Sequence, residues 1–231
     1  MQNRNSKNST AITILFLILI VPVFVYNYFV KGYNNFVHLE IVMQDEGHKI
    51  DAFSLINQDN QIINNDSLKE NIYIANFFFT NCPNICPVMT KNMSYLQSNL
   101  KVYPNIKFVS YTVDPVNDTP ERFVEYIEEM RKKNINIDLK NWDFLTGEKN
   151  KIYKLAASYF ASAREDSIAP GGFLHSEQFF LIDKEGRIRA GKDKNDNVMG
   201  AYDGTNEIHM KNLIDDVKVL MAEYQKPIKD K

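Results

Sequence analysis

The chain of 231 residues has few of the side chains that usually build metal and disulfide sites: two cysteines and four histidines. A structural zinc site normally takes four protein ligands, so here it would need two histidines close to both cysteines. An excess of positive charge is also lacking, because 27 Lys and Arg stand against 29 Asp and Glu, for a formal net charge of −2. No nucleic-acid partner is therefore expected, since such partners are attracted by a basic surface.

Internal repeats and low-complexity linkers are absent as well, which favours one domain with a full core. The one long apolar run, residues 11–30, carries no charge over twenty positions. As a helix it would extend about 30 Å, enough to cross the hydrocarbon core of a membrane. No small-x-small cleavage site follows it, which favours a membrane anchor over a cleaved signal peptide.

The charges on either side of this run predict its orientation. Arg4 and Lys7 precede it without an acidic residue, whereas Glu40, Asp45 and Glu46 follow it. The positive-inside rule then predicts a single-pass protein with its N-terminus in the cytoplasm and its main domain on the external (periplasmic) side. The expected layout is a cytoplasmic tail, a transmembrane anchor, a spacer with a short strand at residues 36–42, an external domain and a C-terminal tail, at residues 1–10, 11–30, 31–47, 48–226 and 227–231.

Both cysteines lie in one short motif, Cys82-Pro-Asn-Ile-Cys86-Pro, directly after an apolar run at residues 72–79 that is typical of a buried strand. If a helix starts here, positions i and i+4 share a face and their Cα atoms lie about 6 Å apart. That spacing suits a disulfide, and it equally suits two thiolates on one soft metal ion. A helix N-terminus would lower the pKa of both thiols. A purely structural disulfide is the weaker interpretation, because so short a ring restrains little of the chain.

The remaining periodicity predicts alternating strands and helices. A helix is expected from the cysteine motif to about Leu100, followed by a final amphipathic helix near the C-terminus that carries Leu213, Val217 and Tyr224. Between them we expect a strand at 106–113, helices at 118–133 and 148–160, and a hairpin of strands at 178–183 and 187–190. This order predicts an α/β, thioredoxin-like fold with a central mixed sheet flanked by helices.

Among the histidines, only His175 is a candidate ligand. It lies immediately before the strand at 178–183, and in a thioredoxin-like sheet the loop entering that strand faces the cysteine-bearing turn. Two thiolates and one imidazole suit Cu(I). An ordinary loop histidine is the alternative. His38, His48 and His209 are expected to be surface residues.

Other possible ligands have simpler interpretations. Met89 and Met93 could offer thioether sulfur to a soft metal, but both match the apolar stripe of the helix and are expected in the core. Asp114 follows a strand end and is expected to shape the rim of the site, because a carboxylate is a hard donor.

Several separate motifs resemble one known family. They are the segment Phe79-Thr-Asn-Cys-Pro-Asn-Ile-Cys-Pro87, then Val113-Asp-Pro115 with Asp118-Thr-Pro-Glu121, then Trp142 with Leu145-Thr-Gly147, His175-Ser176 before Phe180–Asp183, and Tyr202 with Gly204. From about residue 52 to 224 the chain resembles the Sco/SenC family of membrane-anchored, thioredoxin-like copper proteins of cytochrome c oxidase assembly. Many members have an acidic residue where Asn84 stands, which alters only the charge beside the site.

The resemblance implies a copper site made by Cys82, Cys86 and His175, holding Cu(I) and in a second state Cu(II). It implies a metallochaperone that delivers copper to the binuclear centre of cytochrome c oxidase subunit II or a similar acceptor. The alternative is a membrane-anchored thiol-disulfide oxidoreductase that reduces the cysteines of that partner through the Cys82–Cys86 redox pair. Either version requires a thiol reductant to keep the pair reduced. We expect a metal carrier rather than an enzyme.

Two features separate this chain from ordinary disulfide reductases of similar fold, which resemble one another in a two-residue spacing of the cysteines and a cis-proline before the facing strand. Here three residues separate the cysteines, and Phe173 to Phe179 contains no proline. Both differences favour metal handling. A peroxidase of the same fold would need an arginine at the site, for which only the distant Arg164 is available.

Overall fold

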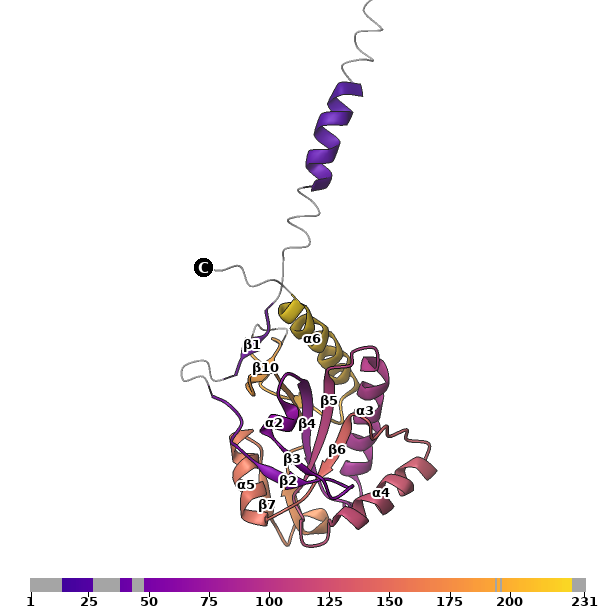
Figure 1. The fold of residues 1–231 in the computed structure, drawn as a ribbon, viewed down its shortest axis with the longest axis vertical. Helices are drawn as coiled ribbons and strands as arrows, with labels where there is room; N and C mark the ends of the chain where they lie inside the picture. Colours follow the sequence, from indigo (N-terminus) through magenta and orange to yellow (C-terminus); the bar gives the residue numbers. More distant parts are fainter. Residues whose placement is uncertain (1–13, 27–37, 43–47, 194, 196, 226–231) are drawn as a thin grey trace, which may run out of the picture. The chain divides into compact units, whose positions relative to one another are not determined.

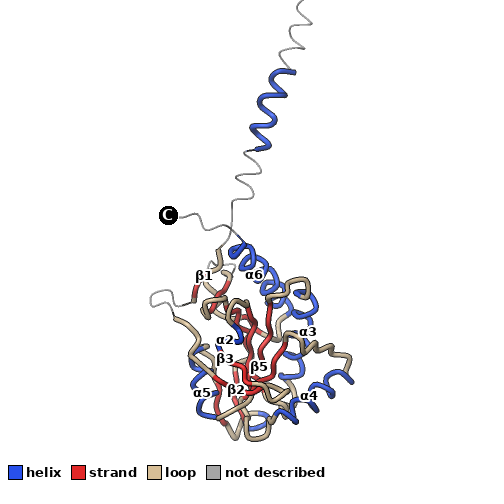
Figure 2. Tube along the Cα trace, viewed as in Figure 1, coloured by secondary structure: helices blue, strands red, loops and turns tan. Residues whose placement is uncertain are grey.

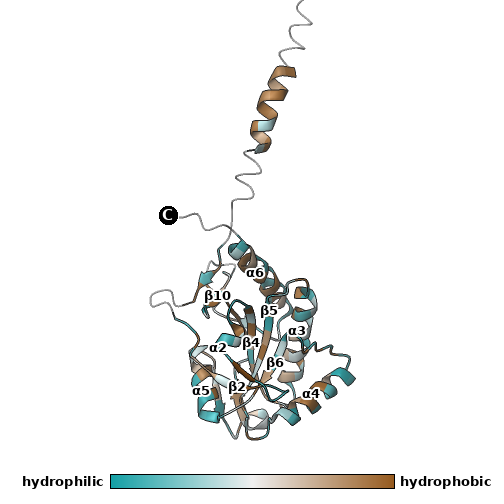
Figure 3. Cartoon of the chain, in the orientation of Figure 1, coloured by the Kyte–Doolittle hydropathy of each residue, from teal (hydrophilic) through white to brown (hydrophobic). Residues whose placement is uncertain are grey.

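The structure is a computed structural model that describes residues 14–26, 38–42, 48–193, 195 and 197–225. The chain forms two compact units, Met1–His38 and Leu39–Lys231. In the first unit, residues 14–26 form a helix whose side chains are exposed and mostly apolar (Figure 3). Over the described residues, no helix is both long and apolar enough to span a membrane. Residues 11–13 and 27–30 of the expected anchor lie outside them, so the anchor stays a prediction.

The second unit is built on a seven-stranded mixed sheet (Figure 1). Its strands follow the order β1-β10-β9-β4-β5-β6, and β11 pairs with β9. Strands β4, β5 and β6 are parallel, whereas β1, β9, β10 and β11 join through antiparallel pairs. The strand bounds are Glu40–Ile41 for β1, Ile72–Phe78 for β4, Ile106–Thr112 for β5, Trp142–Leu145 for β6, Gln178–Ile182 for β9, Ile188–Ala190 for β10 and Tyr202–Asp203 for β11.

Helices cover the sheet because its central strands are apolar on both faces. Every residue of β4 is buried, as the apolar run, interrupted only by Asn76, predicts. The long helices are α3 (Ile85–Leu100), α4 (Pro120–Lys132), α5 (Lys149–Ser158) and α6 (Glu207–Gln225). The crossovers β4–α3–β5 and β5–α4–β6 step across the sheet in the same direction, so right-handed connections place both helices on one face. In Figure 2, α5 lies on the other side of the strands from α3 and α4.

This architecture confirms the predicted α/β, thioredoxin-like fold, and the long predicted elements agree with the observed ones to within a few residues. The sequence analysis missed the short elements. These are β6, the hairpin of β2 (Ser54–Ile56) and β3 (Ile62–Asn64), helix α2 (Asn65–Leu68), the 3-10 turn η2 (Pro170–Gly172), the hairpin of β7 (Ala163–Glu165) and β8 (Phe173–His175), and β11. Segments of two to four residues are too short to establish a period of two.

Helix α4 begins at Pro120, two residues after the start at 118 that the sequence predicted. The N-cap is Thr119, whose hydroxyl accepts a hydrogen bond from the Arg122 N–H at 3.3 Å, and Pro120 occupies the first helical position. Asp118 lies outside the helix and is completely buried. Its side chain is therefore available for contacts elsewhere in the fold.

Candidate metal centre

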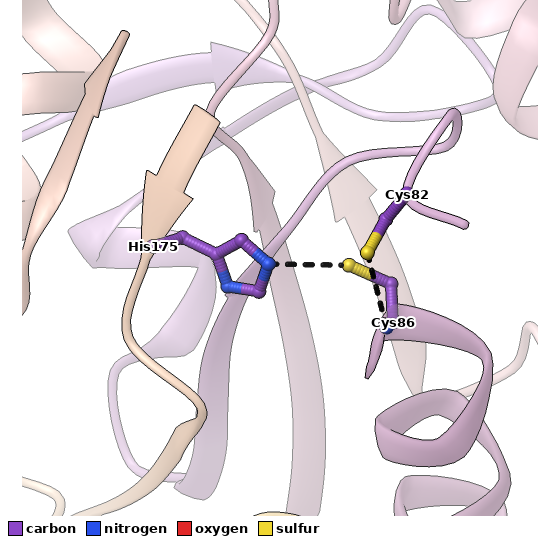
Figure 4. A group of neighbouring side chains, drawn as sticks. All are labelled: Cys82, Cys86 and His175. Carbon is purple, nitrogen blue, oxygen red and sulfur yellow. Dashed lines mark hydrogen bonds between the residues drawn. The ribbon is translucent and has the colours of Figure 1, made fainter. Parts of the chain in front are cut away.

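The two cysteines lie at the junction between β4 and α3 (Figure 4). Cys82 precedes the helix by three residues and is half-buried, whereas Cys86 lies in the first turn and is completely buried. Pro87 also occupies that first turn, where a missing N–H costs nothing. Both cysteines are free thiols, so this is the reduced form of the pair.

The Cys82 sulfur takes the place of a helix cap. Asn84 occupies the N-cap position but its side chain makes no capping hydrogen bond. Instead, Cys82 Sγ accepts a hydrogen bond from the Cys86 N–H at 3.4 Å. The first N–H groups of a helix have no partner within it and attract negative charge. The sulfur thus sits where a thiolate is stabilised.

The local hydrogen bonds favour ionisation of Cys82. A hydrogen bond with the Cys86 side chain is the largest influence that lowers the pKa of Cys82, well below that of an ordinary thiol. Burial opposes this, while the contact with His175 and hydrogen bonds from the backbone of Cys86 and Asn84 add to it. This agrees with the expectation for a sulfur at a helix N-terminus.

For Cys86 the same expectation is wrong. Burial raises the pKa of the Cys86 thiol well above its ordinary value, and the neighbouring Cys82 sulfur raises it further. Burial removes the water that would stabilise a Cys86 thiolate, and the negative charge of the Cys82 sulfur repels a second charge nearby. The helix N-terminus is too weak to compensate for both effects. The reduced pair is therefore asymmetric, with a thiolate at Cys82 and a thiol at Cys86.

His175 faces the two sulfurs from the end of β8. Its Nε2 lies 3.4 Å from Cys86 Sγ, and its Nδ1 lies 3.1 Å from the Ser176 carbonyl oxygen (Figure 4). A carbonyl can only accept, so Nδ1 carries the proton of the neutral ring and Nε2 presents its lone pair to the sulfurs. A metal-ligating histidine is oriented by such a hydrogen bond on its other nitrogen.

The hairpin that carries His175 is held over the site by Phe79. The Phe79 ring packs edge-on against the imidazole, with 5.6 Å between ring centroids, and also contacts the Phe173 ring. The backbone of Gly171 passes close to the Phe79 ring and has a φ of 80°. A Cβ at this position would lie 2.7 Å from a ring atom of Phe79. Only glycine allows this approach without strain. A pocket of about 140 Å³ opens here, lined mainly by apolar residues with Cys82 and His175 among them.

The three donors form the only candidate metal-binding cluster of His, Cys, Asp and Glu within the described residues. Cys82 Sγ, Cys86 Sγ and a His175 ring nitrogen lie within 4.8 Å of one another. Donors about 2.0–2.3 Å from one ion lie about 3.5–4 Å apart in a trigonal arrangement, so closure around a metal needs a shift of about 1 Å. The set is soft, with two sulfurs and one imidazole, and suits copper in its reduced state. The structure thus brings together the residues that the sequence predicted as ligands.

Of the other histidines, His48 and His209 are half-buried rather than fully at the surface as expected, and both form hydrogen bonds within the fold. His48 Nε2 donates to the Ser158 carbonyl oxygen at 2.7 Å, and His209 Nδ1 accepts from the Asp203 N–H at 2.9 Å. His38 is exposed. None of them joins the cluster of Cys82, Cys86 and His175.

The alternative ligands are likewise occupied by other contacts. Met89 and Met93 are completely buried in the core, as predicted. The Asp114 carboxylate accepts from Asn117 Nδ2 at 2.7 Å and forms part of a turn. Arg164 lies on β7, 3.9 Å from an Asp166 oxygen, and does not line the pocket beside Cys82.

Sequence reasoning missed a buried polar network next to the site, centred on Asp118. Its carboxylate accepts hydrogen bonds from the Thr80 and Thr112 hydroxyls, each at 2.5 Å. The motif Asp118-Thr-Pro was interpreted as the start of a helix and as part of the family resemblance, without a role for the aspartate side chain. The available signal was that Thr119 can cap the helix by itself, which leaves the aspartate without a role there.

The sequence of this chain is similar to those of known proteins. The SCO1/SenC family model matches residues 42–208. The SCO1 protein homolog of Bacillus subtilis (strain 168) is 31% identical over 173 residues, which cover 74% of this chain and 82% of that protein.

Solved structures agree with this assignment. A SCO1/SenC family lipoprotein from Bacillus anthracis has a TM-score of 0.65 and 28% identity, over 78% of this chain and 98% of that one. BsSco, described as a Sco-family cytochrome c oxidase assembly protein with a disulfide switch, has a TM-score of 0.62 and 29% identity, over 78% and 96%. Bradyrhizobium japonicum ScoI, solved with copper bound, shares the fold at a TM-score of 0.57 and 21% identity, over 74% and 98%.

The family match spans most of the thioredoxin-like unit and includes the cysteine motif and the histidine hairpin. It agrees with the resemblance inferred from the separate sequence motifs. The chain belongs to the SCO1/SenC family.

Proposed function

We propose that this protein is a copper carrier that holds one copper ion through Cys82, Cys86 and His175 and passes it to the binuclear copper site of cytochrome c oxidase subunit II. The observation that carries the proposal is the convergence of these three donors within 4.8 Å of one another. Family membership supports the link to oxidase assembly, and copper in a solved family member supports the choice of metal.

The chemistry of the donors favours Cu(I). Thiolates and imidazole are soft or intermediate donors, and three of them satisfy Cu(I), which accepts low coordination numbers. Loading releases the proton of the Cys86 thiol, because metals bind the thiolate. His175 already directs Nε2, the nitrogen that would bind the metal, at the two sulfurs. Cu(II) is the second state proposed for the same donors.

Transfer follows from the exposure of the donors. Cys82 is half-buried and borders the pocket, whereas Cys86 is enclosed. A thiolate of the acceptor enters through the pocket and binds beside Cys82 before this chain releases its donors. Cys82 and His175 leave next, and Cys86 holds the ion until the acceptor's ligands replace it. Each step exchanges one ligand, so the ion is never free in solution.

The direct test is a competition titration of the reduced full-length chain with Cu(I) against a chromophoric chelator. One tightly bound equivalent is expected, and His175→Ala should weaken binding by at least tenfold, since a metal loses a ligand. His48→Ala is the matched control, because His48 is also half-buried and hydrogen-bonded but lies outside the cluster. Absence of competitive binding, or equal effects of both variants, would contradict the proposal.

A second function is favoured by the asymmetry of the reduced pair. As a dithiol reductant, Cys82 thiolate attacks a disulfide of the partner and forms a mixed disulfide while one partner thiolate leaves. Cys86, after losing its proton, attacks Cys82 Sγ and releases the second partner thiolate. Two electrons pass to the partner, and an external thiol reductant restores the pair. The description of BsSco as a disulfide switch supports redox cycling of the cysteines in this family.

These functions separate experimentally. Reduction of an oxidised copper-free acceptor domain by stoichiometric, metal-free protein would support the reductase, and Cys82→Ser should abolish it. Copper transfer without net thiol oxidation would support the carrier. His175→Ala divides them further, because it removes a metal ligand but leaves both cysteines.

The location proposed for the protein rests on the apolar run in the sequence and on a membrane-attached member of the family. In this proposal residues 11–30 form a single membrane anchor, residues 1–10 remain in the cytoplasm, and residues 48–226 form the external domain with a tail at 227–231. The expected spacer at 31–47 contributes β1 (Glu40–Ile41) to the sheet of that domain. A family member from Bacillus anthracis is a lipoprotein, which supports attachment to a membrane. Labelling of Cys82 in intact cells by a membrane-impermeant thiol reagent tests the orientation. Labelling only after lysis would overturn it.

A further inference from the structure

A buried polar network begins two residues before Cys82. The Asp118 carboxylate at its centre is completely buried. It accepts hydrogen bonds from the Thr80 backbone N–H at 3.1 Å, from the Thr80 hydroxyl at 2.5 Å and from the Thr112 hydroxyl at 2.5 Å. Thr112 ends β5, and Thr80 follows β4 by two residues. Asp118 therefore joins the ends of two neighbouring strands at the edge of the sheet where the cysteine loop starts.

The direction of every proton in this network is determined by its partners. Thr80 Oγ1 accepts from Arg122 Nε at 3.2 Å, so its single proton is directed to Asp118. Thr112 Oγ1 accepts from the Asp114 N–H at 2.9 Å, so its proton is also directed to Asp118. Both carboxylate oxygens thus act as acceptors, as an ionised group requires. Burial, with a smaller contribution from the Asp114 carboxylate, raises the pKa of Asp118, and these hydrogen bonds oppose that rise.

Thr112 and Thr80 differ in the backbone structure that surrounds them. Thr112 is part of β5, where it pairs with Phe78 of β4 in a regular ladder. Thr80 lies beyond the last residue of β4 and leads into a loop whose residues Asn81, Pro83 and Asn84 are exposed. The contacts of Thr80 with Asp118 are the last buried hydrogen bonds before Cys82.

We propose that Asp118 and Thr80 act as positioning residues that fix the start of the cysteine loop and thereby hold Cys82 against Cys86 and His175. This inference rests on the proposed function, because it concerns the geometry of the same three donors. Within the part of the chain that the structure describes, neither side chain is hydrogen-bonded to the three donors, although the charge of Asp118 contributes to the raised pKa of Cys86. The effect is transmitted through two residues of backbone, and the Cys82 N–H closes that turn on the Phe79 carbonyl oxygen at 3.3 Å.

The test compares two isosteric substitutions that each remove one hydroxyl donor from the same carboxylate. Thr80→Val should weaken Cu(I) binding to the full-length chain by about tenfold, the lower end of the effect of losing a partner that orients a metal ligand. Thr112→Val should leave the affinity within about twofold, because β5 keeps its ladder. Both should lower Tm by similar amounts. Thr80→Ser, which keeps the hydroxyl, should restore the affinity.

Each result decides between positioning and a simpler role. Similar losses of Tm with unchanged affinity in Thr80→Val would mean that the network only stabilises the fold and would overturn the proposal. Equal losses of affinity in Thr80→Val and Thr112→Val would also overturn it, because the charge of Asp118 and not the loop would then be responsible. If Thr80→Val does not fold, Arg122→Gln replaces it, and an unchanged affinity in that variant would have the same meaning.

A metal-free measurement keeps this inference separate from the proposed function. The equilibrium constant of the Cys82–Cys86 pair with glutathione should change several-fold in Thr80→Val and remain the same in Thr112→Val, because closing the disulfide depends on the same placement of Cys82. If the wild-type chain fails to bind Cu(I), the proposed function falls while this constant still tests the clamp of Asp118 and Thr80. Equal constants in both variants would overturn the clamp alone.

Discussion

His175 and Cys86 meet with 3.4 Å between Nε2 and Sγ although 89 positions separate them in the chain. The two residues belong to independent elements, since Cys86 starts α3 and His175 ends the β7–β8 hairpin. The packing of that hairpin on Phe79 and the hydrogen bond between His175 Nδ1 and the Ser176 carbonyl oxygen keep the imidazole beside the sulfurs. Changes in the hairpin should therefore open the site while the cysteines stay in place.

Gly171 is the position in the hairpin where this dependence can be measured. Gly171→Ala should lower the free energy of unfolding by about 2–3 kcal/mol, since the new Cβ adds a clash with Phe79 to the strain of a positive φ. Gly172→Ala is the matched control, because its φ is 85° but no atom lies within 4 Å of the new Cβ. It should cost only about 1 kcal/mol. Urea unfolding measures both, and equal costs would contradict the close packing of Gly171 on Phe79.

The asymmetry of the cysteine pair predicts an unusual pH dependence of alkylation. The pKa of Cys82 is lowered to about 3, so its thiolate is already present at pH 5. Its alkylation by iodoacetamide should change little between pH 5 and 8, whereas an ordinary thiol slows about tenfold for each unit below pH 8. Cys86 should remain unmodified throughout this range. Mass spectrometry after timed quenching identifies the modified residue.

The cause of the low Cys82 pKa is tested by Cys86→Ala. The side chain of Cys86 is the largest influence on that pKa, so its loss should move the pH profile of alkylation upward. A residual preference for the thiolate should persist, because the Cys86 N–H still points at the sulfur. A profile that does not move would assign the effect to the helix N-terminus alone.

Copper removal gives a prediction about stability. Cu(I) binds the folded chain through donors from two separate elements, so it should raise the free energy of unfolding by about 2.7 kcal/mol at a free concentration one hundred times Kd. A strong Cu(I) chelator should reverse the change. In His175→Ala the rise should shrink at the same concentration of copper. A stabilisation that is independent of His175 would show that copper binds the cysteines alone.

The elements predicted correctly from sequence are those with long, regular patterns. The run from Ile72 to Phe79 is apolar at nearly every position, and the stripe through Met89 and Met93 repeats at helical spacing, so β4 and α3 could be located. Strand β6 has four residues and a buried indole whose Nε1–H donates to Ser110 Oγ at 3.0 Å, a contact that local sequence does not encode.

The candidate site likewise has features that could be predicted from sequence and features that could not. The cysteine pair is local in sequence and could be predicted with its spacing. His175 could be nominated only because the topology of a thioredoxin-like sheet brings its loop to the cysteines. The raised pKa of Cys86 and the burial of Asp118 depend on the density of packing around them, which no local pattern records. Burial of polar groups was therefore the part that sequence could not supply.

A buried ion pair fixes the start of the second compact unit and supplies the last prediction. Arg189 contacts Asp183 Oδ2 at 3.2 Å and Glu223 Oε2 at 2.6 Å, and it also donates to the Leu39 carbonyl oxygen at 2.8 Å. The other oxygen of Glu223 accepts from the Leu39 N–H at 2.8 Å. One carboxylate on α6 thus holds both an internal guanidinium and the backbone of the segment that enters the sheet.

Removing the charge of Glu223 should be costly because Arg189 stays buried without its full compensation. Glu223→Gln is expected to lower the free energy of unfolding by about 3 kcal/mol, as for other broken buried pairs. Asp215→Asn is the control on the same helix, since its pair with Lys218 is exposed and should contribute under about 0.5 kcal/mol. Urea unfolding of the two variants gives the comparison. Similar losses would mean that Asp183 alone compensates Arg189, and that Glu223 holds Leu39 through hydrogen bonding without an essential charge.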